Sequence, residues 1–200
     1  MIPLPEDMCN AEHASTLRCP TCLCLRTLRP HGGYWRHVAR LLGDGSVEEL
    51  TKRIVRVRCK ACGVTHALLP FCLVPWSPFT VALCLVAVSR CLAGERVASV
   101  AADLHAGPTS VRKMLADARR VVSSTGSPCG GGPMSAAEAE TASRALAETA
   151  SDEEAFAQKF WRAHRTAPFS RIPLPWWRRR GPGWVPPQHS VGAPGAPEAP

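Results

Sequence analysis

The sequence predicts an α+β protein: a small β-rich zinc ribbon, then a trihelical helix-turn-helix domain, then a helical and finally disordered C-terminal region. Two CxxC pairs frame a segment with the two-residue period of strands, prolines close that segment, and the apolar residues after them follow the period of helices. We therefore expect six parts: residues 1–15 (flexible lead-in), 16–78 (zinc ribbon), 79–122 (helix-turn-helix), 123–134 (linker), 135–166 (helical region) and 167–200 (disordered tail rich in Pro, Arg and Trp).

The two CxxC pairs are the strongest signal in the chain. Each pair places two thiols at the ends of a tight turn, so the four thiolates of Cys19, Cys22, Cys59 and Cys62 can close a tetrahedron around one Zn²⁺. Gly63 follows the second pair and can take the left-handed conformation that such a turn often needs. A closed shell leaves no position for a catalytic water, so we expect one structural Zn²⁺. A thioredoxin-like redox site would need a βαβ pattern, which the sequence lacks.

Three histidines leave a second ligand set open. His66 lies four residues after Cys62, and His13 and His31 are nearby in the sequence, so a Cys₃His site is an alternative. Surface or core histidines are the more frequent case. Of the other six cysteines, four are expected to be small buried hydrophobes and two to lie in loops without a specific role: Cys24, Cys72, Cys84 and Cys91, and Cys9 and Cys129.

Short strands are expected around the cysteine pairs. Residues 22–28 alternate like a strand, residues 30–33 indicate a turn, and residues 34–42 are expected to pair back as a hairpin. Residues 43–45 break that strand, and residues 64–69 complete a hairpin at the second cysteine pair. Between them, the segment KRIVRVR places Val55 and Val57 on one face of a strand and Arg56 and Arg58 on the other.

Positive charge is concentrated in the first 122 residues. The chain has a net charge of +8, and residues 13–72 hold ten Arg or Lys against three Asp or Glu. Such a distribution suits a surface that meets a polyanion, and Arg53, Arg56 and Arg58 are the candidates for phosphate contacts in the ribbon. A generic basic domain is the alternative.

Three helices are expected after the proline boundary. Residues 79–92 are largely apolar, and residues 97–104 form a second, short helix rich in alanine. After a turn at residues 105–108, Thr109 or Ser110 can cap the third helix.

The short second helix, the Gly-containing turn and the basic third helix form a helix-turn-helix pattern, in which the second helix of the pair lies in the major groove of DNA. Near the start of that helix, the candidates for base contacts are Thr109, Ser110, Arg112 and Lys113. Arg119 and Arg120, further along its outer face, are candidates for phosphate contacts. The alternative is an ordinary helical hairpin with a solvated charged face.

The C-terminal part offers weaker signals. Two helices are expected after the linker, each opened by a capping box, Ser135 with Glu138 and Ser151 with Glu154. The tail contains PWWRRR at residues 175–180, whose rings and charges suit stacking on bases or docking on a partner, although a simply disordered tail is the commoner case.

The order of the motifs resembles one bacterial family. CPTC, HGGYWR, IVRVRCKACGVTHALLP and FCLVPWSPFTV, followed by a helix-turn-helix pattern, are similar to a family catalogued as a domain of unknown function, which itself resembles the N-terminal zinc-ribbon modules of transposases. The resemblance covers about residues 18–80. It implies that the four CxxC cysteines bind metal, that Arg56 and Arg58 form a basic strand, and that the protein associates with DNA. Trp76 stands where an aromatic residue, usually tyrosine, is expected.

We therefore expect a zinc-stabilised, transposase-related and non-catalytic protein whose partner is double-stranded DNA; a homodimer is one option. No catalytic core is recognisable after residue 122. The N-terminus lacks a signal peptide and the apolar run at residues 81–88 is too short to span a bilayer, so no membrane partner and a cytoplasmic, nucleoid-associated location are expected. The alternatives are a truncated transposase product and a zinc-ribbon module that binds other proteins.

Overall fold

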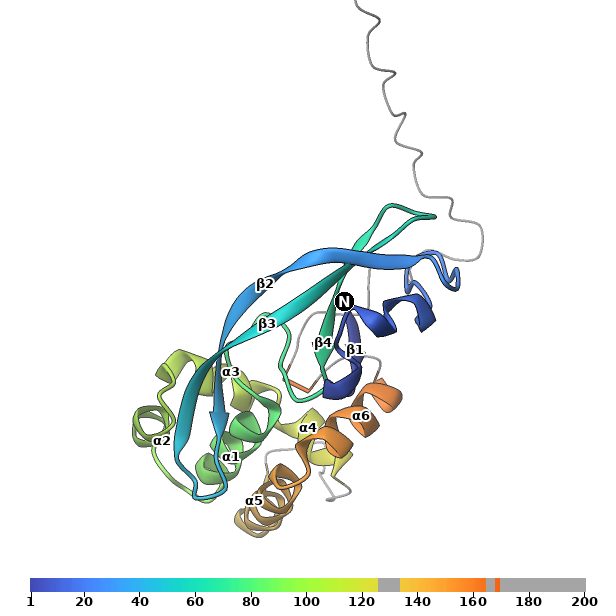
Figure 1. The fold of residues 1–200 in the computed structure, drawn as a ribbon. Coiled ribbons are helices and arrows are strands. Elements are labelled where there is room, and N and C mark those ends of the chain that lie inside the picture. Colours follow the sequence, from blue (N-terminus) through green and yellow to red (C-terminus); the bar gives the residue numbers. More distant parts are fainter. Residues whose placement is uncertain (126–133, 165–167, 170–200) are drawn as a thin grey trace, which may run out of the picture.

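The structure, a computed structural model, describes residues 1–125, 134–164 and 168–169 (Figure 1). Cys129, most of the expected linker and nearly all of the expected tail, with the PWWRRR segment at residues 175–180, lie outside the described residues. The described part contains a four-stranded sheet and six α-helices, so the predicted α+β class is confirmed.

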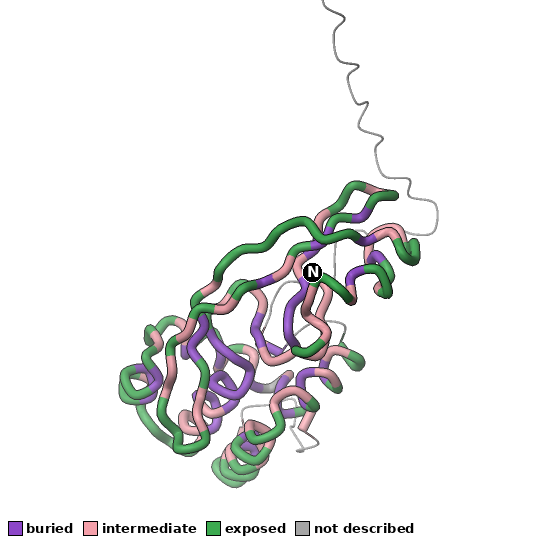
Figure 2. Tube along the Cα trace, in the orientation of Figure 1, coloured by how far each residue is buried: buried purple, intermediate pink, exposed green. Residues whose placement is uncertain are grey.

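The sheet has the strand order β1-β4-β3-β2. Its strands are β1 (Ile2–Leu4), β2 (Leu28–Leu41), β3 (Val47–Cys59) and β4 (Thr65–Pro70). β1 runs parallel to β4, and the other neighbours are antiparallel. β2 and β3 form a long curved ribbon that leads from the cysteine loops to the helices (Figure 1), and β2 is exposed over much of its length (Figure 2).

The first 15 residues, expected as a flexible lead-in, contain regular structure. β1 pairs with β4, from Ile2 opposite Leu68 to Leu4 opposite Pro70. Two 3-10 helices follow, at Glu6–Met8 and Glu12–Thr16. Because the pairing of β1 joins segments more than 60 residues apart, the local periodicity of apolar residues does not predict it.

The turn predicted at residues 30–33 is wrong, and so is the strand predicted at residues 22–28. β2 passes through residues 30–33 without reversing, because its partner is β3 and not the segment that precedes it. The predicted break at residues 43–45 is confirmed. It lies in the β2–β3 turn, where Gly45 has a φ of +83°.

A β-bulge in β2 takes the place of the predicted turn. Pro30 pairs with Val57, and Gly33 pairs with Val55. Two residues of β2 therefore lie opposite the single residue Arg56. Because side chains alternate along a strand, the extra residue exchanges the two faces of β2 from this point onward.

Two adjacent glycines permit the bulge. Gly32 has a φ of +72°, a conformation that other residues rarely adopt, and a Cβ on Gly33 would lie 2.7 Å from the backbone oxygen of Ile54. The Gly-Gly pair that indicates a turn in the sequence thus serves the bulge instead.

Six α-helices pack together, namely α1 (Val81–Leu92), α2 (Val97–Asp103), α3 (Pro108–Ala116), α4 (Ala118–Ser124), α5 (Ala136–Ala150) and α6 (Glu153–His164). The helices α1, α2 and α3 lie near the tip of the β2–β3 hairpin, and α6 lies below β1 (Figure 1). All six contribute buried residues to one apolar cluster, to which Leu146 of α5 and Phe160 of α6 belong as fully as Leu83 of α1. Among the described residues, no helix is both long and apolar enough to cross a membrane.

The start of α3 differs from the expectation. Gly107 is the N-cap residue and Pro108 is the first helical residue, so neither Thr109 nor Ser110 caps the helix. Proline suits this first position because its fixed φ is helical and its missing N–H would have no helical partner there.

Two further details of the helices concern their ends. The third helix stops at Ala116, so Arg119 and Arg120 lie on the separate helix α4. The capping box at Ser135 is confirmed. At α6 the carboxylate of Asp152, rather than the predicted Ser151, accepts a bond from the backbone N–H of Ala155 (3.3 Å).

The segment between sheet and helices, residues 71–80, is tied to both. The N–H of Ala39 on β2 donates to the C=O of Pro78 (2.6 Å), and the N–H of Thr80 donates to the C=O of Ala39 (3.1 Å). At the base of the loop, the N–H of Val81 donates to the C=O of Cys72 (2.8 Å). These bonds hold the tip of the loop, with Trp76, beside the sheet.

Candidate metal centre and basic face

The four cysteines of the CxxC pairs lie in two loops with the same backbone pattern. In each loop the N–H of the fourth residue after the first cysteine donates to the C=O of that cysteine, over 2.9 Å from Leu23 to Cys19 and from Gly63 to Cys59. That fourth residue has a left-handed conformation in both loops, with φ of +63° at Leu23 and +73° at Gly63. The role predicted for Gly63 is confirmed, and a leucine fills the equivalent position.

The four sulfur atoms lie close enough together to share one metal ion. The Sγ atoms of Cys19 and Cys62 are 3.7 Å apart, those of Cys22 and Cys59 are 3.6 Å apart, and all four lie within 4.8 Å of one another. A tetrahedron with metal–sulfur bonds of about 2.3 Å has edges of about 3.8 Å. The predicted set of four cysteines can therefore hold a metal ion, and four thiolates in a tetrahedron suit zinc or iron.

The surroundings of the thiols differ. Burial raises the pKa of Cys19 and holds that of Cys62 far above its usual range. Burial also acts to raise the pKa of Cys59, but hydrogen bonds from the Thr27 hydroxyl and the backbone N–H groups of Cys62 and Ala61 bring it down to about 6. A cation between the four sulfurs favours all four thiolates.

His66 is a neighbour of the centre. Its Nε2 lies 3.5 Å from the Sγ of Cys19, and burial lowers its pKa to about 4. An imidazole N–H at this position can donate to a thiolate and so orient a metal ligand. The group close enough to share an ion consists of the four sulfurs, and the described residues do not support the Cys₃His alternative. The ring of His13 is instead bonded to the side chain of Asn10 (2.9 Å).

The other cysteines divide by burial. Cys84 is buried as predicted, Cys72 and Cys91 are half-buried, and Cys24, predicted to be buried, is exposed. Burial raises the pKa of Cys9 and of Cys72 to about 12, so these thiols are protonated at neutral pH.

One face of the β2–β3 ribbon is strongly basic. Arg56 and Arg58 lie on the opposite face from the buried Val57, as predicted, but the buried Ile54 shares the face of the arginines, so the predicted division is confirmed only in part. The cross-strand register adds residues of β2 to the same face, because paired side chains share a side of the sheet. We define the basic face by these residues: Arg29, Tyr34, Arg36, Arg40, Lys52, Arg56 and Arg58.

Few of these charges are neutralised. Arg40 pairs with Glu48 (2.7 Å) and Lys52 pairs with Glu6. The arginines at positions 29, 36, 56 and 58 make no ion pair with any residue that the structure describes. Arg53, the third candidate of the ribbon, lies on the opposite face, where it pairs across the strands with Trp35.

The candidates on α3 differ in exposure. Thr109, Arg112 and Lys113 are exposed and Ser110 is half-buried. Ser110 and Lys113 line a hollow of about 420 Å³ between α3 and the tip of the 71–80 loop, and Trp76 forms part of its wall.

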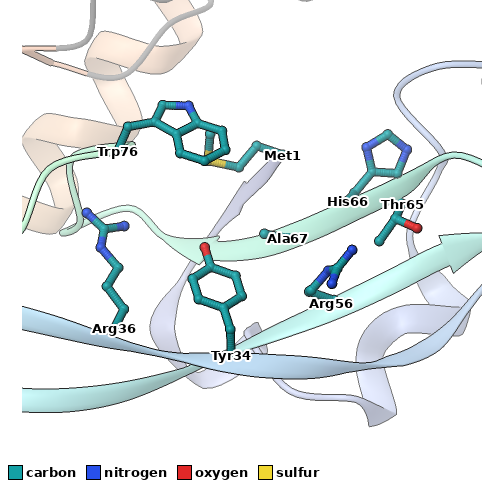
Figure 3. Close-up of a pocket in the computed structure, with 8 residues that line it drawn as sticks. All are labelled: Met1, Tyr34, Arg36, Arg56, Thr65, His66, Ala67 and Trp76. Carbon is teal, nitrogen blue, oxygen red and sulfur yellow. The ribbon is translucent and has the colours of Figure 1, made fainter.

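Trp76 also lines a second hollow, of about 400 Å³. Arg56 of the basic face lines this one, together with Tyr34 and Arg36 (Figure 3). The structure thus brings Arg56, Ser110 and Lys113 to two hollows that share one tryptophan wall. We call the one at the sheet the sheet hollow and the one at α3 the helix hollow.

The last two DNA-binding candidates are placed differently. Arg120 points back into the helical part, where its guanidinium lies 3.5 Å from the carboxylate of Asp117 and 5.6 Å from the ring centre of Phe160. Arg119 lies on α4, and its side chain is outside the described part.

A comparison with family models bears on this segment. Residues 17–112 match a domain of unknown function, DUF6431. The match begins two residues before Cys19 and ends within α3, so the DUF6431 segment contains the metal centre, the basic face, the 71–80 loop and the start of α3. The resemblance to a domain of unknown function is confirmed, and it extends beyond residue 80. No curated protein and no solved structure has significant similarity to the chain.

Two residues of the site were not among the sequence-based candidates. Tyr34 and Arg36 reach the basic face only because of the bulge, which the sequence suggested as a turn. The motif HGGYWR contains the signal, since a Gly-Gly pair between residues with strand character also suits a bulge.

Proposed function

We propose that this protein is a zinc-stabilised, non-catalytic DNA-binding protein related to the DNA-binding modules of transposases. The observation that carries the proposal is that Trp76 lines one hollow with Arg56 of the basic face and another with Ser110 and Lys113 of α3. A polyanion lying along this surface would meet arginines from β2 and β3 and polar side chains from α3.

Zinc is the metal that the proposal assigns to the four cysteines. The sulfur spacing of 3.6 and 3.7 Å suits a tetrahedral ion, and closed four-cysteine sites are typical of structural zinc. The metal would stabilise the end of the β2–β3 ribbon next to the basic face. Metal analysis of the purified protein distinguishes zinc from iron, which would also colour the protein.

The proposed helix-turn-helix consists of α2, the turn and α3. The N–H of Ala106 donates to the C=O of Ala101 (2.8 Å), which closes α2, and Gly107 begins α3. Val111 and Met114 are buried, whereas Thr109, Arg112 and Lys113 are exposed. This division suits a helix that packs on one side and contacts the major groove with the other.

Duplex binding is the direct test. We expect a fluorescein-labelled 20-base-pair duplex to bind the zinc-loaded protein, with an affinity that falls steeply as salt is raised. Arg56→Ala should weaken binding to every sequence, while Arg112→Ala should also alter sequence preference. Arg53→Ala is the matched control, since it removes the same charge from the opposite face of the same strand. Absence of binding at low salt contradicts the proposal.

A protein-binding module is the second candidate, because apolar side chains are exposed on the cysteine loops. Leu23 and Leu25 of the first loop and Val64 of the second are exposed. If this surface serves a partner or a homodimer, Leu25→Asp should abolish self-association in sedimentation velocity while leaving duplex binding intact. A monomeric wild-type protein that binds DNA would favour the first candidate.

A further inference from the structure

The sheet hollow combines aromatic rings with arginines. Tyr34, Arg36 and Arg56 rise from β2 and β3, and Trp76 faces them from the tip of the 71–80 loop (Figure 3). The small side chain of Ala67 on β4 lies between these groups and leaves the space open (Figure 3). A hollow of about 400 Å³ falls in the size range of small-molecule sites.

Trp76 has an unfavourable position, both in its exposure and in its backbone conformation. Its side chain is 78% exposed and its backbone has a φ of +59°, a left-handed conformation that is unfavourable for a residue other than glycine. Neither burial nor backbone preference explains a tryptophan here. The loop bonds at Ala39 and Val81 fix the segment on either side of it, so the indole is presented at the hollow by a braced loop.

The two arginines give the hollow an unbalanced positive charge. Arg36 is half-buried, and one of its nitrogens donates to the C=O of Val74 at the foot of the same loop (2.5 Å). Neither Arg36 nor Arg56 makes an ion pair with a described residue, and the residues lining the hollow include no carboxylate. A guanidinium removed from water without an acidic partner favours a bound anion.

We propose that the sheet hollow binds one unpaired nucleotide of a nucleic-acid strand, with its base against Trp76 and Tyr34 and its phosphate at Arg36 and Arg56. The inference rests on the proposed DNA binding and adds a preference for strands with an unpaired end or bulge. Aromatic rings bind bases of any sequence by stacking, and arginines track the phosphates. An acidic peptide would satisfy the arginines but would leave both rings without a flat partner.

Because Trp76 lines both hollows, the proposed nucleotide site adjoins the proposed duplex-binding surface. Trp76 lines both the sheet hollow and the helix hollow, which Ser110 and Lys113 also line. A duplex held at α3 would thus end or distort next to Trp76, and the nucleotide beyond the paired region would enter the sheet hollow.

The experiment compares two fluorescein-labelled probes by anisotropy: a blunt 16-base-pair duplex and the same duplex with a four-nucleotide single-stranded overhang. We expect the wild-type protein to bind the overhang probe roughly tenfold more tightly, because stacking of one base contributes about 1–3 kcal/mol. Trp76→Ala and Tyr34→Ala should each bring the ratio of affinities close to one. Ala67→Leu should do so too, by filling the hollow without removing a ring or a charge.

Trp35→Ala is the matched control. Trp35 is the neighbour of Tyr34 in β2, is 69% exposed, and lies on the opposite face of the ribbon, so its removal should leave the ratio unchanged. A wild-type ratio near one, or an equal loss in Trp35→Ala, overturns the nucleotide site while leaving duplex binding standing.

Further binding and competition measurements distinguish the other possible ligands of the sheet hollow. Binding of single-stranded (dT)₈ that depends on Trp76, without binding of the blunt duplex, supports the sheet hollow and contradicts the proposed duplex function. Competition by free deoxyadenosine monophosphate as strong as that by (dT)₈ overturns the assignment to a strand. Equal competition by hexaglutamate overturns the assignment to a nucleotide, and binding of none of these probes overturns both proposals.

Discussion

Cys59 is the cysteine of the metal centre whose pKa falls. It lies near 6, whereas burial raises the pKa of Cys19 and Cys62. The Thr27 hydroxyl, 3.2 Å from the Sγ of Cys59, can donate to a thiolate there. Of these three thiols, Cys59 is therefore the one most readily available as a thiolate to bind a cation first.

This difference predicts how zinc affinity depends on pH. Above pH 6, Cys59 is already a thiolate, so binding displaces no proton from it, while it still displaces protons from thiols with raised pKa values such as Cys19 and Cys62. Below pH 6, protons also compete at Cys59, which adds a loss of about tenfold per pH unit. Competition with a chromophoric chelator from pH 5 to 8 measures the slope. In Thr27→Val the steeper part should begin at a higher pH, and an identical profile contradicts this account.

Replacement of a single ligand should empty the site. We expect Cys62→Ser to lower the metal content from one ion per chain to a small fraction, because a neutral hydroxyl is a poor substitute for a thiolate. Mass spectrometry of the purified protein with inductively coupled plasma gives the stoichiometry. Cys24→Ser is the control: Cys24 is exposed, lies two residues after Cys22 and is outside the four-sulfur group, so its variant should keep a full complement.

Among the elements, β2 departs most from what its sequence suggests. Its composition indicates two short segments and a turn, yet it is one strand of 14 residues with a bulge. Sequence patterns correctly predicted the features that depend on neighbouring residues alone. These are the capping box at Ser135, the turn before Val47 and the left-handed conformation of Gly63. The same patterns did not predict strand pairing between segments that are distant in the sequence, as in the pairing of β1 with β4 and of β2 with β3.

The site follows the same division. The four cysteines could be predicted because the spacing of a metal-binding loop is encoded within four residues. The sheet hollow could not, since Tyr34, Ala67 and Trp76 come from three separate segments. Their meeting depends on the register of β2 and on the 71–80 loop, and the Gly-Gly pair that signals a bulge does not by itself give the partner strand or the place of the loop.

The bulge itself can be tested with one methyl group. Gly33→Ala should destabilise the protein by about 1–3 kcal/mol, because the added Cβ would lie 2.7 Å from a backbone oxygen of β3 that cannot move easily. Urea unfolding measures the change. Gly43→Ala in the β2–β3 turn is the control, since a Cβ there meets nothing within 4 Å, and we expect a change of no more than about 0.5 kcal/mol. Equal stability of the two variants contradicts the role given to Gly33.

The whole molecule contains buried clusters that differ in size and in what holds them together. At the metal end, four buried residues among those that the structure describes accompany Cys19 and Cys59, namely Ala14, Leu28, Val57 and Leu68. The helical cluster includes residues of all six helices and also Ala39 of β2. The metal end therefore depends on its ion much more than the helical end does.

Removal of the metal should accordingly unfold one end of the molecule. With a strong chelator we expect hydrogen–deuterium exchange to rise across residues 18–37 and 51–69, while α1, α5 and the tip of the β2–β3 hairpin stay protected. The tip is covered by helices, since Leu41 and Val47 pack against the helical cluster. Simultaneous loss of protection in α1 would contradict this independence, and no change at residues 18–37 would contradict a structural role of the metal.

The bulge gives the pairing of β2 an importance that its composition does not have. If the same residues paired regularly with β3 from Pro30 onward, without the bulge, Trp35 and His37 would turn toward the 71–80 loop and Tyr34 and Arg36 away from it. Most single replacements along this strand alter one contact each. Loss of the bulge at unchanged length would instead reverse every later side chain at once, whereas removal of His31 or Gly32 would take out the extra residue and keep the later pairs. Related chains should therefore have either a bulge here or a strand that is one residue shorter.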